Sequence, residues 1–126
     1  MITAADKARR RARVEAACAA LPEVEITGQG GQHMGAKVRG RTVVWLTDDH
    51  QGDGIFGLVG KAPPGVQQDL IASGPERFFP PMYLHHRGWI GLRMDRETVD
   101  WDEVDWVVRQ SYRLVAPKRL AALVPA

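Results

Sequence analysis

The stretch RGWIGLRMDRETVDWDEVDWVVRQSYRLVAPKRL, residues 87–120, decides the fold of this chain. Residues 89–94 are mainly apolar, as in a buried strand. Asp100 then precedes a helix whose first turn carries Asp102 and Glu103, which interact favourably with the positive end of the helix dipole. One side of this helix is apolar at helical spacing and forms a predicted core face of Trp101, Val104, Val108, Ser111, Tyr112 and Val115. The stretch therefore predicts a strand and an amphipathic helix over one core, followed by a short basic tail at residues 116–120.

The remaining elements follow from capping, turn and alternation signals. Thr3 with Asp6 three residues later resembles a capping box, and Pro22 ends the helix that starts there. A second helix is expected at residues 66–72. Further strands are expected at residues 36–39, 41–47, 55–59 and 82–85, with a turn at Arg39-Gly40 between the first two. The order α-β(3)-α-β(2)-α predicts an α+β fold, a two-layer sandwich of an antiparallel sheet and helices.

Length and composition are those of one globular domain spanning residues 1–126. The chain is 44% hydrophobic and 25% charged, which is ordinary for such a domain. No apolar run approaches the ~20 residues that span a bilayer. The basic N-terminus is not followed by the hydrophobic region of a signal peptide, and a single cysteine, Cys18, excludes an internal disulfide. A cytoplasmic location in a bacterial-type cell is expected, with no membrane partner.

Positive charge is concentrated at the start of the chain. Residues 1–13 have a charge balance of +4, whereas the whole chain has +2, so the remaining residues are mildly acidic. The apolar stripe of the first helix, Val14, Cys18 and Leu21, continues backwards as Lys7, Arg10 and Arg11. The basic first turns are therefore expected to overhang the body partly, either as a solubilising terminus or as an arm for a polyanion.

Several short pieces of the chain resemble the MmcQ/YjbR-like family, in order and in spacing. They are ALPEV at residues 20–24, KVRGR at 37–41, DDH at 48–50, KAPPG at 61–65, PERFF at 75–79, RGW at 87–89 and SYRLVAPKRL at 111–120. The resemblance implies an α-β(3)-α-β(2)-α fold, of the kind also seen in CyaY-like and secretion-chaperone-like proteins. It also implies a DNA-binding role by comparison with winged DNA binders, and it carries over no catalytic residues or cofactor.

Basic hairpin tips are the leading candidate site, with DNA as the partner. Lys37, Arg39 and Arg41 alternate around the first predicted turn and would crowd one side of its tip if the hairpin is regular. Arg87 in the second turn, with Lys118 and Arg119 in the basic tail, would extend this surface. Neutralising a phosphate releases counterions, which favours binding of such a surface to a nucleic-acid backbone. Alternatively, these cations are a solvated surface that protects the sheet edge from aggregation.

A pocket for a small anionic ligand is the alternative. Its predicted residues are His33, Asp49, His50, Lys61, Phe79, Tyr83, His86 and Trp89, with Lys61 and His86 as polar anchors. All four histidines fall in loops or at strand ends, so they are expected to converge at one end of the sheet. No metal site is predicted, because the histidines and carboxylates lack a recognised ligand spacing.

A third interpretation is an interaction module, either monomeric or homodimeric. Trp106 falls on the polar side of the last helix, and an exposed tryptophan often marks a contact surface. Catalysis is not expected. Cys18 lies on the buried stripe of the first helix, and neither Ser73 nor Ser111 has an adjacent base or an elbow motif.

Overall fold

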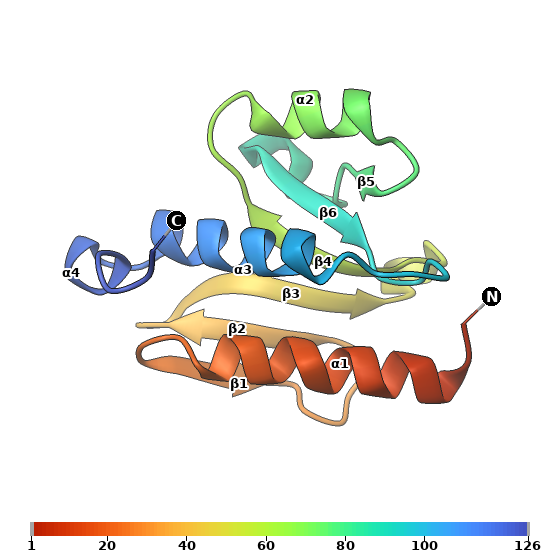
Figure 1. Cartoon of the computed structure of the whole chain (residues 1–126), viewed down its shortest axis with the longest axis horizontal. Helices are drawn as coiled ribbons and strands as arrows, with labels where there is room; N and C mark the ends of the chain where they lie inside the picture. The colour runs from red at the N-terminus through yellow and green to blue at the C-terminus, as the bar shows by residue number, and fades with distance from the viewer. Residues whose placement is uncertain (1, 126) are drawn as a thin grey trace.

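A six-stranded antiparallel sheet forms the centre of the computed structural model, which describes residues 2–125 (Figure 1). Its strand order is β1-β2-β3-β4-β6-β5. The strands are β1 (Val24–Thr27), β2 (Met34–Val38), β3 (Arg41–Asp48), β4 (Phe56–Lys61), β5 (Phe78–Phe79) and β6 (Trp89–Arg93). The helices are α1 (Ala4–Ala19), α2 (Val66–Ser73), α3 (Trp101–Val115) and α4 (Lys118–Ala121), with 3₁₀ turns η1 (His50–Gly52) and η2 (His85–Arg87). The predicted α+β class with an antiparallel sheet and helices is confirmed.

The two edges of the sheet differ from the sequence prediction. β1 was not predicted, because its four residues between Pro22 and Gly28 are too few to establish an alternating pattern; it is held by pairing with β2. The strand predicted at residues 82–85 is wrong. β5 lies earlier and pairs with Leu92 and Gly91 of β6. Proline cannot donate to a ladder, so the Pro80-Pro81 pair that follows β5 ends the pairing, and the chain then turns into η2.

The core lies between the sheet and the two long helices, α1 and α3, which cross the same face (Figure 1). Alternate strand residues point to this face and are buried, among them Leu46, Leu58 and Ile90. The predicted core face of α3 is confirmed, since Val104, Val108 and Tyr112 are at most 1% exposed. The Tyr112 hydroxyl donates to the Pro22 carbonyl at 2.8 Å and so joins α3 to the end of α1. No helix within residues 2–125 has the length and apolar character needed to cross a bilayer.

The side chain of Ser111 in α3 is hydrogen-bonded to the bulged residue of β3. Ala36 pairs with Val44 and Lys37 with Thr42, so Val43 has no partner residue in β2. The Ser111 hydroxyl donates to the Val43 carbonyl and accepts from the Lys61 N–H at 2.8 Å. Ser111 is completely buried. One hydroxyl therefore satisfies two backbone groups on neighbouring strands and fixes α3 over β3 and β4.

The start of α1 is bound to the body, so the predicted overhang is wrong. The expected capping box between Thr3 and Asp6 is present. Arg10 donates to the carbonyls of Met94 (2.9 Å), Arg96 (2.5 Å) and Glu97 (3.0 Å) in the segment between β6 and α3. Lys7 and Arg11 similarly contact neighbouring strands and loops. The basic residues at the start of α1 thus bind the body through hydrogen bonds and not through apolar contacts. Their partners are distant in the sequence, so these contacts could not be predicted from it.

Candidate functional site

The six cations that were predicted to contact phosphate occur at one end of the sheet, which we call the hairpin end. It comprises the turn between β2 and β3, the start of β6 with η2, and α4 (Figure 1). The strand pairing places the first turn and the start of β6 at the same end, because Gly60 pairs with Val44 while Lys61 pairs with Trp89. Helix α4 belongs to this end because the charge of Arg119 helps to lower the pKa of Glu23, the ion-pair partner of Arg39. The cations are Lys37, Arg39 and Arg41 around the first turn, Arg87 in η2, and Lys118 and Arg119 in α4.

The first turn has the two-residue geometry expected for Arg39-Gly40, with positive φ angles of 50° and 78°. Val38 pairs with Arg41, and Lys37 pairs with Thr42. Directly paired residues share a face and successive residues alternate, so Lys37 and Arg41 emerge on opposite faces of the ribbon. The expectation that the three cations crowd one side of the tip is therefore wrong. With a two-residue turn, Arg41 shares a face with Val38, and Lys37 therefore lies on the other face.

Arg39 is held by a carboxylate at the hairpin end. Its Nε donates to Oε1 of Glu23 at 2.7 Å and its Nη2 donates to Oε2 at 3.1 Å. The hydrogen bonds from Arg39, with a smaller effect of the nearby Arg119 charge, lower the pKa of Glu23. Within residues 2–125, the other five cations make no ion pair. The hairpin end thus exposes more positive than negative charge.

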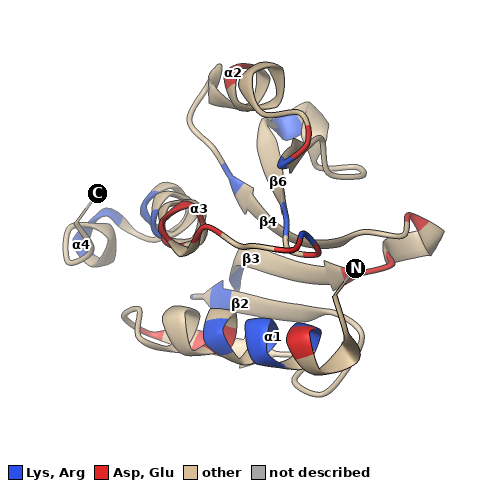
Figure 2. Cartoon of the chain, turned by 45° about the vertical axis from the view of Figure 1, so that its right-hand side comes forward, with Lys and Arg blue, Asp and Glu red and all other residues tan. Residues whose placement is uncertain are grey.

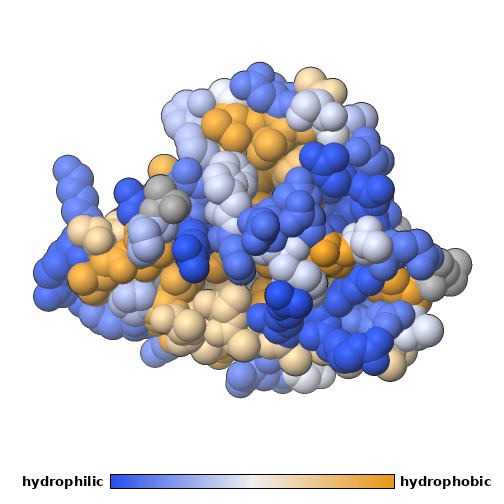
Figure 3. All heavy atoms as spheres, viewed as in Figure 1, coloured by the Kyte–Doolittle hydropathy of each residue, from blue (hydrophilic) through white to orange (hydrophobic). Residues whose placement is uncertain are grey.

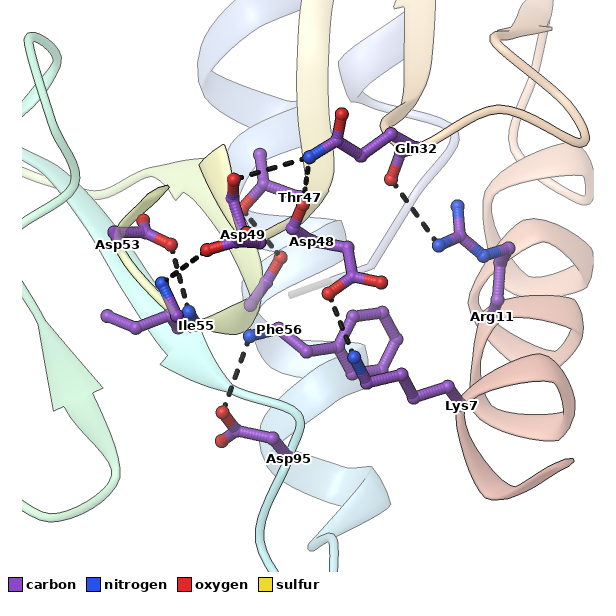
Figure 4. Close-up of polar contacts among 12 residues, drawn as sticks. Lys7, Arg11, Gln32, Thr47, Asp48, Asp49, Asp53, Ile55, Phe56 and Asp95 are labelled. Carbon is purple, nitrogen blue, oxygen red and sulfur yellow. Dashed lines mark hydrogen bonds and ion pairs between the residues drawn. The ribbon is translucent and has the colours of Figure 1, made fainter. Parts of the chain in front are cut away.

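Acidic residues occur at the opposite end of the sheet, where Figure 2 shows red segments near the end of β3. Figure 4 shows how these side chains are held by neighbouring groups. Lys7 Nζ lies 2.9 Å from Oδ1 of Asp48. Asp49 accepts from the Gly54 N–H at 2.8 Å, and Asp53 accepts from the Ile55 N–H at 2.9 Å. The cations at the start of α1 are therefore committed to this end of the molecule and are not a free arm.

Acid should weaken the fold partly through Asp95, which lies at this same end. Burial alone would raise the pKa of Asp95, but hydrogen bonds from Arg93 and the Phe56 N–H outweigh it and hold the pKa below 3.8. A lowered pKa in the folded state stabilises the fold above the unfolded pKa, and this contribution is lost as the pH falls through the folded value. Asp95→Asn should therefore be less stable than wild type at neutral pH, and the difference should shrink below about pH 4.

Urea unfolding of both proteins at neutral and acidic pH measures this difference. Asp69→Asn is the control, because Asp69 is exposed on α2 and its side chain makes no hydrogen bond within residues 2–125. A stability difference between Asp95→Asn and wild type that stays constant from neutral to acidic pH would contradict the role of the Asp95 charge.

A cavity of about 300 Å³ lies on the face of the sheet opposite α1 and α3. Side chains of β3, β4 and β5 form its floor, the segment after β5 forms its roof, and the loops before β2 and after β3 form one end. The lining residues are His33, Trp45, Thr47, His50, Asp53, Val59, Phe79, Pro81, Met82, Tyr83 and Leu84. The Tyr83 hydroxyl donates to Oε1 of Gln51 at 2.9 Å and so joins the roof to η1.

The structure brings half of the predicted pocket residues together in this cavity. His33, His50, Phe79 and Tyr83 line it, whereas Asp49, Lys61, His86 and Trp89 do not. Lys61 and Trp89 pair with each other near the hairpin end. The four histidines do not converge but form two pairs, His33 with His50 at a ring separation of 5.2 Å and His85 with His86 at 3.9 Å. Within residues 2–125, no group of three or more histidine, cysteine or acidic side chains could hold a metal ion.

The strand residues of the cavity floor were not predicted from the sequence. Trp45 and Thr47 alternate with the buried Val44 and Leu46 of β3, and Val59 follows the buried Leu58 of β4. Period-two alternation assigns these side chains to the second face of the sheet. That signal was present in the sequence, but it could not indicate whether this face was covered or hollow.

Trp106 of α3 is 36% exposed. It lies beside a shallow hollow that Leu70 and Phe78 also line, and Figure 3 shows apolar atoms exposed between α2 and α3. Asp102 and Arg109 lie beside it in a second, more polar depression. The predicted position of Trp106 on the exposed side of the helix is thus observed.

A sequence profile described as YjbR matches residues 19–114, which include the sheet, the cavity and most of the hairpin end. The chain belongs to the YjbR family. Among solved structures, it is similar to Deinococcus radiodurans protein DR2400, which contains the domain DUF419. The TM-score is 0.67 at 20% sequence identity, over 82% of this chain and 76% of that chain, a likeness that establishes the shared fold. No curated protein matches significantly. The YjbR match ends before α4, so Lys118 and Arg119 lie outside the matched residues.

Proposed function

We propose that this YjbR-family protein binds the phosphate backbone of duplex DNA through its hairpin end. The observation that carries this proposal is that cations far apart in the sequence, at residues 37–41, 87 and 118–119, occur at the same end of the sheet. The cations of α1 instead contact the acidic end. The charge is therefore separated along the sheet, which orients the protein relative to a polyanion.

The spacing of the two tips supports contact with phosphates. The β2–β3 turn and the start of β6 are separated by β3 and β4. Neighbouring strands lie about 4.8 Å apart, so the tips are separated by roughly 12 Å across the strands, and the first turn also extends beyond the start of β6 along the strands. The two tips are therefore separate points of contact, and Arg41 and Arg87 would bind different phosphates of one duplex.

The proposed role is binding without catalysis, because the candidate nucleophiles are structural. Cys18 is completely buried, and burial raises the pKa of its thiol to about 12. The Ser111 hydroxyl is engaged with two backbone groups. The Ser73 hydroxyl donates to the carbonyl of Leu70 within its own helix.

Fluorescence anisotropy with a short labelled duplex tests the proposal. Affinity should fall steeply with salt, because each neutralised phosphate contributes a slope of about −0.9 in log K against log salt. Arg41→Ala and Arg87→Ala should each weaken binding about fivefold and reduce the magnitude of the slope by about 1. Glu23→Gln should tighten binding, because it releases Arg39 from its ion pair.

The matched control is Arg96→Ala, which removes one exposed positive charge from the opposite end of β6. It should leave the affinity and the salt slope unchanged. The proposal is wrong if the wild-type protein does not bind duplex DNA at low salt, or if Arg96→Ala weakens binding as much as Arg41→Ala does.

A further inference from the structure

We propose that the cavity on the open face of the sheet binds a small, flat aromatic molecule that carries no negative charge and has a hydrogen-bond acceptor at its edge. This site lies on a different surface from the hairpin end and does not depend on DNA binding. Its volume of about 300 Å³ is at the lower end of the range of about 300–1,000 Å³ for small-molecule pockets. The space suits a compound of one or two rings.

The floor of the cavity is made flat by glycines. Gly57 and Gly91 lie beneath the ring of Phe79, and Gly35 lies beneath the ring of Trp45. A Cβ added at Gly57 would come within 2.7 Å of the Phe79 ring, one added at Gly35 would come within 2.8 Å of the Trp45 ring, and one at Gly91 would overlap Phe79. All three glycines are in strands without positive φ, so their contribution is space and not backbone freedom.

These strand glycines have an energetic cost, because glycine weakens a strand interior. In return, the Trp45 and Phe79 rings lie close to the sheet, with Val59 also forming the floor. A flat aromatic ligand stacks favourably on such rings in an offset or edge arrangement. The apolar side chains of the roof, including Met82 and Leu84, would cover its other side.

The polar end of the cavity offers a hydrogen-bond donor. Nδ1 of His33 accepts from the Asp48 N–H at 3.2 Å, so the neutral ring carries its proton on Nε2. The His33 and His50 rings are in an edge-to-face contact, and the ring nitrogens of His50 make no hydrogen bond within residues 2–125. An acceptor on the ligand edge would bind the His33 Nε2–H.

The charge of the lining excludes an anionic ligand, in contrast to the anionic ligand expected from the sequence. Among the described residues, the lining contains the carboxylate of Asp53 but no lysine or arginine. Lys61 and His86, the predicted anchors, lie outside it. An anionic group would lose its hydration next to Asp53 without gaining a cation, which is unfavourable.

Titration of the ¹⁵N-labelled wild-type protein with three matched probes tests this inference by NMR. Quinoline is uncharged at neutral pH and has a ring acceptor, quinoline-6-carboxylate adds a negative charge, and naphthalene keeps the shape but lacks the acceptor. Quinoline should shift the Trp45 indole N–H and the amides around Val59 and His33. Quinoline-6-carboxylate and naphthalene should each bind at least about tenfold more weakly.

Two variants test the assigned contacts, with thermal unfolding as a check of the fold. His33→Phe keeps a flat ring but removes the donor, and it should weaken quinoline binding about tenfold. His86→Phe, outside the cavity, should have no effect. Absence of quinoline shifts at millimolar concentration, shifts centred away from the cavity, or tighter binding of quinoline-6-carboxylate than of quinoline would overturn the inference. Equal quinoline affinity in His33→Phe and wild type would also overturn it, because the acceptor would then have no role.

Discussion

Ser111→Ala should lower the free energy of unfolding by about 3 kcal/mol, the largest single effect that we expect. The substitution removes the hydroxyl that accepts from Lys61 N–H and donates to the Val43 carbonyl. Both backbone groups then lack this partner, at a site where Ser111 is fully buried. An unsatisfied buried polar group costs about 1–3 kcal/mol. The two groups lie beyond Val44 and Gly60, the last paired residues of β3 and β4 at this end, so the strand pairing does not satisfy them in place of the hydroxyl.

Urea unfolding of wild type and Ser111→Ala measures this loss. Ser73→Ala is the matched control, because its hydroxyl is exposed and makes only a local bond within α2; it should change stability by less than about 0.5 kcal/mol. If Ser111→Ala is as stable as Ser73→Ala, the bridge between α3 and the two strands does not contribute to stability.

Arg10→Ala should lower the free energy of unfolding by about 2 kcal/mol, the second largest effect. The Arg10 guanidinium donates to the carbonyls of Met94, Arg96 and Glu97. These carbonyls belong to the segment that leads from β6 into α3. Bonds from a charged donor are stronger than neutral ones, and here they join α1 to a segment more than 80 residues away in the chain.

Arg9→Ala is the control, since Arg9 is exposed and forms only a surface ion pair with Asp6. It should cost no more than about 0.5 kcal/mol. Arg10→Lys should recover only part of the loss, because a single ammonium group cannot reproduce the fork of the guanidinium. Equal stability of the Arg9 and Arg10 alanine variants, as measured by urea unfolding, would contradict the role of Arg10 as a tether.

The two proposed surfaces differ in their physical basis. The hairpin end depends on exposed charges whose effect is screened by salt. The cavity depends on half-buried aromatic rings and one oriented donor, and its binding should depend little on salt. Quinoline affinity that is insensitive to salt, in a protein whose DNA affinity falls steeply with salt, would separate the two activities in one preparation.

Local features of the fold were predictable from the sequence alone. The capping box at Thr3 and Asp6, the Arg39-Gly40 turn and the core face of α3 each depend on residues near one another in the chain. The edge strands were not predictable in this way. β1 is stabilised by pairing with β2, and the prolines after β5 are decisive only because β6 is its neighbour.

The candidate sites show the same division more sharply. The sequence identified His33, His50, Phe79 and Tyr83 as pocket residues because of their chemical types, and it identified the cations around the hairpins. It could not separate the four histidines into two pairs, nor remove Lys61 from the pocket. By itself the sequence determined which residues carry charge, which are apolar and where the chain turns, because these properties are local. Only the tertiary structure decided that the cations meet at one end and that the second face of the sheet is hollow. The reason is that both features depend on which strands become neighbours and on how much space their side chains fill, and these residues are far apart in the chain.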